Sequence, residues 1–142
     1  MKVLHTSDWH VGKTIRGRSR ADEHAAVLAE IVGIADAEAV DLVLVAGDLF
    51  DSAAPPPDAE QIVYRTLLEL ARGGERPVVV IAGNHDNARR FAAVAPLLAG
   101  VGVQVVPMLT GPADGGVIDI EVGGQTARLA VVPFPSKRYI VT

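Results

Sequence analysis

The amino-acid sequence predicts an α/β protein with a mostly parallel sheet, flanking helices and a C-terminal antiparallel hairpin. Short, almost wholly apolar segments alternate with longer segments in which apolar residues recur at helical spacing, as in parallel sheets covered on both faces. The first three apolar segments run directly into polar residues, as a ligand-binding sheet edge would require. After Gly115 apolar and polar residues alternate around a Gly-Gly pair, which is typical of a hairpin packed by one face.

Each element follows from a local pattern. Apolar residues at 27, 28, 31 and 34 have the spacing of one helix face. The prolines at 55–57 argue against regular structure before Asp58, and the Gly-Gly pair at 73–74 ends the helix that follows. The expected elements are a strand at 2–7, a helix at 21–39, a strand at 41–46, a helix at 58–72, a strand at 77–82, a helix at 88–99, a strand at 103–106 and a hairpin at 117–132.

The composition favours a protein of a reducing compartment. The 142 residues include no cysteine, which excludes disulfides and thiolate metal sites and favours a cytoplasmic location. No signal peptide is expected, because His5 and Asp8 interrupt the apolar start, and no apolar run is long enough to cross a membrane. The formal net charge of −4 gives no sign of general affinity for nucleic acid.

Three expected strands end in side chains that can bind metal. The carboxyl ends of parallel strands share one edge of the sheet, so these side chains should lie close together. Buried carboxylates without a cationic partner are costly unless a metal ion neutralises them. Oxygen and imidazole ligands without sulfur favour Mn²⁺, Mg²⁺, Fe²⁺ or Zn²⁺. The residues are Asp8 and His10 after the first strand, Asp48 and Asp51 after the second, and Asn84, His85 and Asp86 after the third.

The spacing of these residues resembles a known family. Asp8-x-His10, Gly47-Asp48-x-x-Asp51 and Gly83-Asn84-His85-Asp86 are similar to the first three signature blocks of the calcineurin-like metallophosphoesterases. The segments LHTSDWHVGK, SR…EH and VAGDLFD resemble the members that act as nuclease subunits in bacterial double-strand-break repair. The resemblance implies an αββα sandwich, of which this chain is the first half. Residues 1–142 would then be the N-terminal portion of a single nuclease domain.

The resemblance also implies roles for single residues. Asp8 and His10 would bind one divalent ion, Asp48 would bridge two ions, and Asn84 would bind the second, with Mn²⁺ as the expected metal. His85 would act beside the scissile phosphate without binding metal. Asp51 or Asp86 would orient the His85 imidazole, or alternatively each would cap the helical segment that follows it. Of the other histidines, His5 is expected in the core and His24 at the surface.

A basic segment follows the first of these blocks. Lys13, Arg16, Arg18 and Arg20 could hold a DNA backbone through phosphate contacts, which require no reading of bases. The alternative is a solvated loop without a ligand.

The chain also departs from the family pattern. The family completes its metal pair with three further histidines, whereas the histidines here are His5, His10, His24 and His85. We therefore expect the chain to be inactive alone and to self-associate, as a homodimer or by exchange of segments. The predicted function is a metal-dependent DNA nuclease in repair and recombination that works with an SMC-like ATPase. The alternatives are a phosphoesterase for a small phosphoester and a non-catalytic dimerisation or docking fragment.

Overall fold

The computed structural model of the chain describes residues 1–137 and confirms the predicted fold class. Its centre is a four-stranded, wholly parallel sheet in the order β1-β4-β5-β6. The strands are β1 (Val3–Thr6), β4 (Leu42–Ala46), β5 (Val78–Ile81) and β6 (Val103–Val106). Each lies within a segment predicted to be a strand, so the apolar runs were sufficient to locate them.

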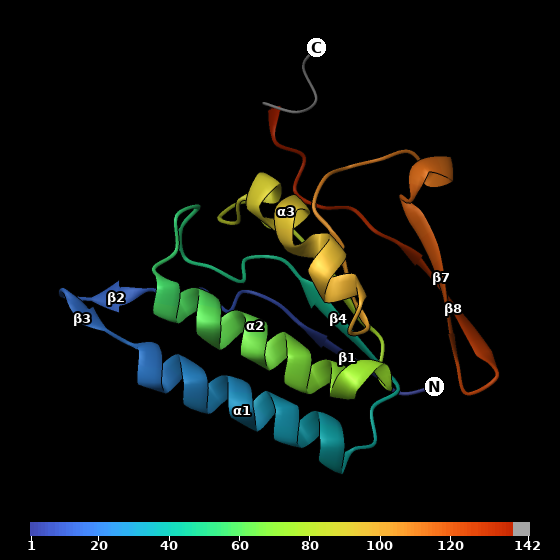
Figure 1. Cartoon of the computed structure of the whole chain (residues 1–142), viewed down its shortest axis with the longest axis horizontal. Helices are drawn as coiled ribbons and strands as arrows, with labels where there is room; N and C mark the ends of the chain where they lie inside the picture. Colours follow the sequence, from blue (N-terminus) through green and yellow to red (C-terminus); the bar gives the residue numbers. More distant parts are fainter. Residues whose placement is uncertain (138–142) are drawn as a thin grey trace.

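Three helices cover one face of this sheet. They are α1 (Ala21–Ala37), α2 (Pro57–Ala71) and α3 (Ala88–Ala99), with α1 and α2 running side by side in front of the strands (Figure 1). Short 3-10 turns occupy Arg72–Gly74 and Pro112–Asp114. Alternate strand residues such as Val43, Val45, Val78 and Val80 pack against helix residues in the main core. The second helix begins at Pro57 and not after it, because proline at the first helical position needs no N–H partner.

The second face of the sheet is covered by the C-terminal hairpin, formed by β7 (Val117–Val122) and β8 (Gln125–Ala130). Leu42, Val79, Val106 and Val131 form a smaller apolar cluster there, with partly buried hairpin side chains packed against it. Both faces are therefore covered, but by different means, and the cover on the second face is partial. His5 in β1 is exposed on the rim of a pocket on this face, so its expected place in the core was wrong.

The basic segment is folded into a second, small hairpin that the sequence did not predict. Its strands are β2 (Thr14–Ile15) and β3 (Arg18–Ser19), which pair in antiparallel register. Arg16 and Gly17 form the turn with φ angles of 50° and 76°, as two-residue hairpin turns require. The β2–β3 hairpin projects beyond the N-terminal end of α1 (Figure 1). Within residues 1–137 no helix combines the length and apolar character needed to span a membrane.

Candidate metal centre

The loops after β1 and β4 run side by side beyond the ends of the strands. The Asp8 N–H donates to the Gly47 carbonyl at 3.0 Å, and the His10 N–H donates to the Asp48 carbonyl at 3.0 Å. Asp8, His10 and Asp48 have φ angles of 57°, 47° and 53°, in the left-handed region that non-glycine residues seldom occupy. Such conformations persist where the surrounding structure imposes them, and they concentrate at functional sites.

Two glycines allow the β4 and β5 loops to meet. A Cβ atom on Gly47 would lie 2.8 Å from the Cα atom of Gly83. A Cβ atom on Gly83 would lie 2.1 Å from the Asp48 Oδ1 atom. Neither separation is possible for a real side chain, so glycine at both positions is what brings Asp48 against the loop that carries Asn84 and His85.

Asp8, His10 and Asp48 form one potential metal-binding group. His10 Nε2 lies 3.7 Å from Asp8 Oδ1 and 3.7 Å from Asp48 Oδ2. The other oxygen of Asp48 accepts a hydrogen bond from the His85 N–H at 2.9 Å, which fixes the orientation of the carboxylate. Asp48 is buried, His10 is mostly buried, and the Asp8 side chain is 67% exposed, so the group opens to solvent on the Asp8 side.

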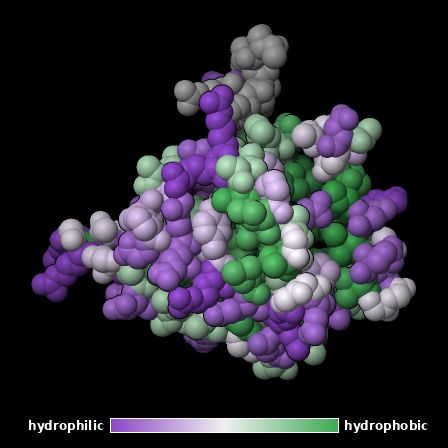
Figure 2. Space-filling view, in the orientation of Figure 1, coloured by the Kyte–Doolittle hydropathy of each residue, from purple (hydrophilic) through white to green (hydrophobic). Residues whose placement is uncertain are grey.

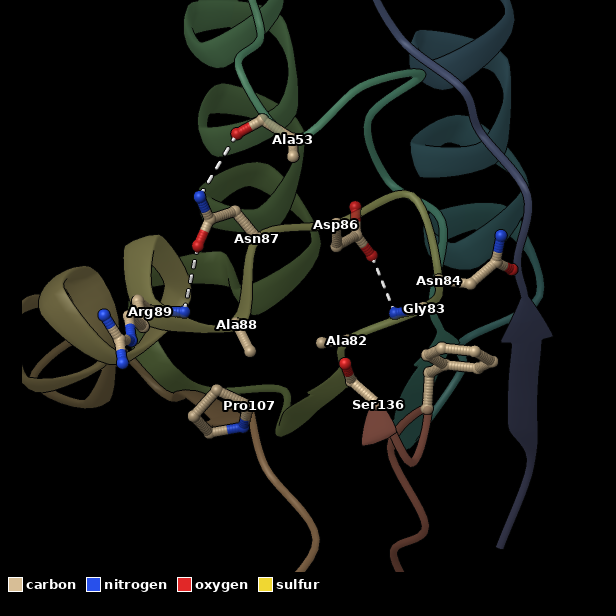
Figure 3. A pocket seen from close by; sticks show the side chains of 11 residues that line it. Ala53, Ala82, Gly83, Asn84, Asp86, Asn87, Ala88, Arg89, Pro107 and Ser136 are labelled. Atoms are coloured by element: carbon tan, nitrogen blue, oxygen red, sulfur yellow. Dashed lines mark hydrogen bonds between the residues drawn. The ribbon is translucent and has the colours of Figure 1, made fainter. Parts of the chain in front are cut away.

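Asn84, the fourth predicted ligand, lies in the loop between β5 and α3 and is exposed. In Figure 3 its amide is directed away from Asn87 and Arg89. The glycine contact described above places its loop against Asp48.

His85 is held by the backbone of the loop after β4. Its Nδ1 atom lies 2.8 Å from the Asp51 carbonyl oxygen, so in the tautomer that this bond requires, Nδ1–H donates to the carbonyl. The imidazole is exposed, and its ring centre lies 4.8 Å from that of His10, at a steep angle. The hydrogen bond to the Asp51 carbonyl is the main cause that raises the pKa of His85, and the nearby Asp48, Asp51 and Asp86 carboxylates act in the same direction.

Asp51 contacts the site in a way that the sequence did not indicate. Its carbonyl, and not its carboxylate, accepts the bond from His85. The carboxylate lies 3.4 Å from the other imidazole nitrogen, Nδ1, of His10. The capping alternative was wrong, because α2 begins after Pro56 and has no side-chain cap.

Asp86 joins the two loops. Its carboxylate accepts hydrogen bonds from the N–H groups of Gly83 at 2.9 Å, Phe50 at 3.0 Å and Leu49 at 3.3 Å. Burial raises the pKa of Asp86, although these three donors act in the opposite direction. The cap of α3 is Asn87, which accepts from the Arg89 and Arg90 N–H groups, so the capping role considered for Asp86 was wrong.

The charge pattern of the site suits a divalent cation. Asp8, Asp48 and Asp51 all have His10 as an ion-pair partner within 4.0 Å. One imidazole cannot neutralise three carboxylates, and two carboxylates with an imidazole are ligands that Mn²⁺ accepts. The residues present therefore fit a metal centre, with Asn84 as a further oxygen ligand on the adjoining loop.

A pocket of about 440 Å³ adjoins this loop. It is lined by residues of the β5–α3 loop and of the segment around Phe134, including Asn84, Asp86, Asn87 and Arg89 (Figure 3). The Phe134 N–H donates to the Ala82 carbonyl at 2.9 Å, which holds that segment against the end of β5.

The four basic residues differ in their surroundings. Lys13, Arg16 and Arg18 are exposed on and beside the β2–β3 hairpin. Arg20 precedes α1 and binds Glu23 through two hydrogen bonds of 2.6 and 2.8 Å. Its guanidinium is therefore engaged within the chain, unlike the expected open position.

His24, expected at the surface, is partly buried in the first turn of α1. Its Nδ1 atom is buried and has no hydrogen-bond partner among the described residues. Burial, and then the charge of Arg20, lower the pKa of His24, while Asp51 lies near enough to act in the opposite direction. The only sequence signal was its position close after the basic segment.

Comparison with known proteins agrees with this geometry. A model of the calcineurin-like phosphoesterase family matches residues 1–129. The chain is 42% identical over 137 residues to the SbcD subunit of nuclease SbcCD from Bacillus subtilis, which covers 96% of this chain and 34% of the relative. The SbcD proteins of Rhodobacter capsulatus and Escherichia coli K12 are 43% identical over 111 residues and 35% identical over 142 residues, covering 78% and 100% of this chain and 27% and 35% of the relatives.

The chain thus spans about a third of the length of the curated relatives it matches. The family match, in contrast, extends from the first strand into the last and includes every candidate ligand. The chain belongs to the calcineurin-like phosphoesterase family.

Proposed function

We propose that this chain forms the N-terminal portion of a nuclease domain that hydrolyses DNA phosphodiester bonds in double-strand-break repair and recombination. The observation that carries the proposal is the position of His85. Its imidazole is fixed by the Asp51 carbonyl, while its own N–H fixes the Asp48 carboxylate of the candidate metal group. A proton donor and a metal-binding carboxylate are thereby held in one rigid unit, in a chain whose relatives are named as nucleases.

In this proposal Asp8 and His10 hold one divalent ion, Asp48 contacts two, and Asn84 holds the second, with Mn²⁺ as the metal. Bound there, such a pair would activate water and stabilise charge on the phosphate. His85 supplies a proton to the leaving oxygen. Its raised pKa favours the protonated imidazole that this step requires. Asp51 keeps the ring in place through its carbonyl, and Asp86 keeps the two loops together.

DNA is the proposed substrate, and the β2–β3 hairpin is its proposed contact. Lys13, Arg16 and Arg18 would bind phosphates without reading sequence. The proposed partner is an SbcC-like SMC ATPase, by analogy with the name of the relatives. A cytoplasmic, nucleoid-associated location and a homodimer complete the proposal. For the dimer, Leu97 on α3 is 76% exposed, and Figure 2 shows an apolar surface over this helix.

One observation favours a different phosphoesterase. The pocket beside Asn84 is of a size that suits a small ligand, so a small phosphoester remains the second candidate substrate. The exposed basic hairpin favours DNA, because a small substrate has less need of three cations there. A non-catalytic docking fragment is the third candidate, since no histidine follows His85.

The test compares Mn²⁺-dependent degradation of linear duplex DNA with hydrolysis of a nitrophenyl phosphodiester. It uses the full product of the reading frame, with the 142-residue chain in parallel. We expect DNA cleavage by the former and none by the chain alone, since Asp8, His10, Asp48 and Asn84 are few ligands for two ions. Cleavage of the small diester without any cleavage of DNA would favour the second candidate, and no hydrolysis of either would favour the third.

The control variant separates catalysis from metal binding. His85→Ala should lower cleavage by about 10²–10⁴-fold, the usual contribution of a general acid, and leave the Mn²⁺ content unchanged. His5→Ala, which removes an exposed histidine of β1, should change neither. Loss of Mn²⁺ together with activity in His85→Ala would contradict the proposed role.

A further inference from the structure

Three side chains at the edge of the candidate metal centre form a second group that could hold an ion. One ring nitrogen of His10, one of His85 and one carboxylate oxygen of Asp51 all lie within 4.8 Å of one another. This group shares only His10 with the group formed by Asp8, His10 and Asp48. We propose that His10, Asp51 and His85 form a zinc site that competes with the Mn²⁺ site for His10.

The geometry of the His10–Asp51 pair already suits zinc. His10 Nδ1 lies 3.4 Å from Asp51 Oδ1. Two ligands at the usual Zn–N and Zn–O lengths around a tetrahedral ion are themselves separated by about 3.4 Å. The Nδ1 atom is buried and has no hydrogen-bond partner among the described residues, although it faces this carboxylate. A buried nitrogen in that state gains a partner when an ion binds.

The third ligand would come from His85, which is exposed and can adjust. Its ring stands across that of His10 with the centres 4.8 Å apart, and it reaches the group from the opposite loop. Two imidazoles and one carboxylate, with water in the fourth position, are the ligand set of catalytic zinc sites. The first group, with two carboxylates and one imidazole, is richer in oxygen and suits Mn²⁺ better. The two groups therefore differ in the metal they prefer.

The two sites exclude each other through His10. A neutral imidazole has a single lone pair, so it binds metal through Nδ1 or through Nε2 but not through both. The Asp8 and Asp48 oxygens face Nε2, whereas the Asp51 oxygen faces Nδ1. Zinc bound on the Asp51 side thus removes a ligand from the Mn²⁺ site and occupies the His85 imidazole. Its effect would be inhibition, a consequence that rests on the proposed function, whereas the binding itself does not.

The experiment measures metal binding to the 142-residue chain, so it needs no catalysis. Zn²⁺ affinity is obtained by competition with a chromophoric chelator, and Mn²⁺ affinity by titration calorimetry. We expect His85→Ala to weaken Zn²⁺ binding by more than about tenfold, at least the loss that removal of an outer contact to a metal ligand produces, and to leave Mn²⁺ binding unchanged. Asn84→Ala should do the reverse. His5→Ala should change neither, and His10→Ala should weaken both.

Circular dichroism shows whether each variant is folded, and His85→Gln provides a second variant at the same position. Equal Zn²⁺ affinity in the wild-type chain, His85→Ala and His85→Gln would overturn the proposal, as would the absence of zinc binding by the wild-type chain. A failure of DNA cleavage by the full protein would contradict the proposed function but would leave these binding results as they are.

Discussion

Asp8, His10 and Asp48 account for half of the six non-glycine residues with positive φ in residues 1–137. Each such conformation costs on the order of 1–3 kcal/mol, which the surrounding hydrogen bonds must offset. The N–H groups of Asp8 and His10 provide two of these bonds, to the Gly47 and Asp48 carbonyls. The conformations turn the three side chains toward one another, so local stability is lost in favour of a fixed ligand geometry.

The contact between the glycine of the β5 loop and Asp48 leads to a first prediction. Gly83→Ala should abolish Mn²⁺ binding and destabilise the fold by about 1–3 kcal/mol, because its Cβ would overlap both Oδ1 and N of Asp48. Urea denaturation and calorimetric titration with Mn²⁺ measure the two effects. Gly33→Ala in α1 is the matched control, since no atom lies within 4 Å of its added Cβ. It should stabilise the chain by about 0.5–1 kcal/mol. Normal Mn²⁺ binding by Gly83→Ala would disprove the steric argument.

A second prediction concerns the hydrogen bond to the Asp51 carbonyl. Asp51→Asn keeps this carbonyl and removes only a charge, so the pKa of His85 should stay above its ordinary value of 6.5 in the metal-free chain. The raised pKa means that the folded chain holds this proton more tightly than the unfolded chain does. The associated stability is present below the ordinary pKa and is lost as the pH rises through the folded value. Titration of the imidazole by nuclear magnetic resonance measures the pKa. A return to 6.5 in Asp51→Asn would mean that the carboxylate is responsible.

At the scale of elements, the β2–β3 hairpin is the unit to test for DNA contact. Arg16→Asn with Arg18→Ala should weaken DNA binding by the full protein and reduce the salt dependence of its affinity by about one unit of slope per lost phosphate contact. Asparagine is chosen at position 16 because it tolerates the positive φ found there. Anisotropy titrations at several salt concentrations provide the slope. Arg128→Ala, in the β7–β8 hairpin, is the control, because Arg128 is also exposed but pairs with Asp119. Unchanged salt dependence in the hairpin variant would exclude this role.

Elements with several turns or pairs could be predicted from the sequence, and smaller ones could not. The helix that became α3 was predicted with its observed ends, because its apolar spacing and the polar loop before it agree. The β2–β3 hairpin has only two residues in each strand, too few for any periodicity to appear. Its one signal was the Arg16-Gly17 pair, which can adopt a hairpin turn but does not require one.

The candidate site was predictable in its residues but not in all its contacts. Strand ends and spacing brought Asp8, His10 and Asp48 together in advance. The link from Asp51 to His85 runs through a carbonyl, which every residue has, so side-chain identity could not reveal it. The place of Asp86 depends on how closely Gly47 and Gly83 approach, which is a property of the packed loops.

At the scale of the whole molecule, two apolar clusters of unequal size lie on either face of the sheet. Leu67→Ala, in the larger cluster under α2, should lower the free energy of unfolding by about 2–5 kcal/mol and speed amide exchange throughout the sheet. Leu129→Ala, in the smaller cluster, should speed exchange mainly in the β7–β8 hairpin, because local opening there does not require global unfolding. Native-state hydrogen exchange distinguishes the two patterns. Equal acceleration in both regions by either variant would show that the faces unfold as one unit.

The register of the sheet also fixes when the site can form. β1 pairs with β4, residue 3 opposite residue 42, and β4 pairs with β5, residue 43 opposite residue 78. Asp8 therefore has none of its distant neighbours until the chain has grown past the second strand, and the loop of His85 arrives only with the third. During synthesis the carboxylates leave the ribosome long before they can share a cation. Metal binding is thus a late event in folding, which secures the finished sheet and cannot guide its assembly.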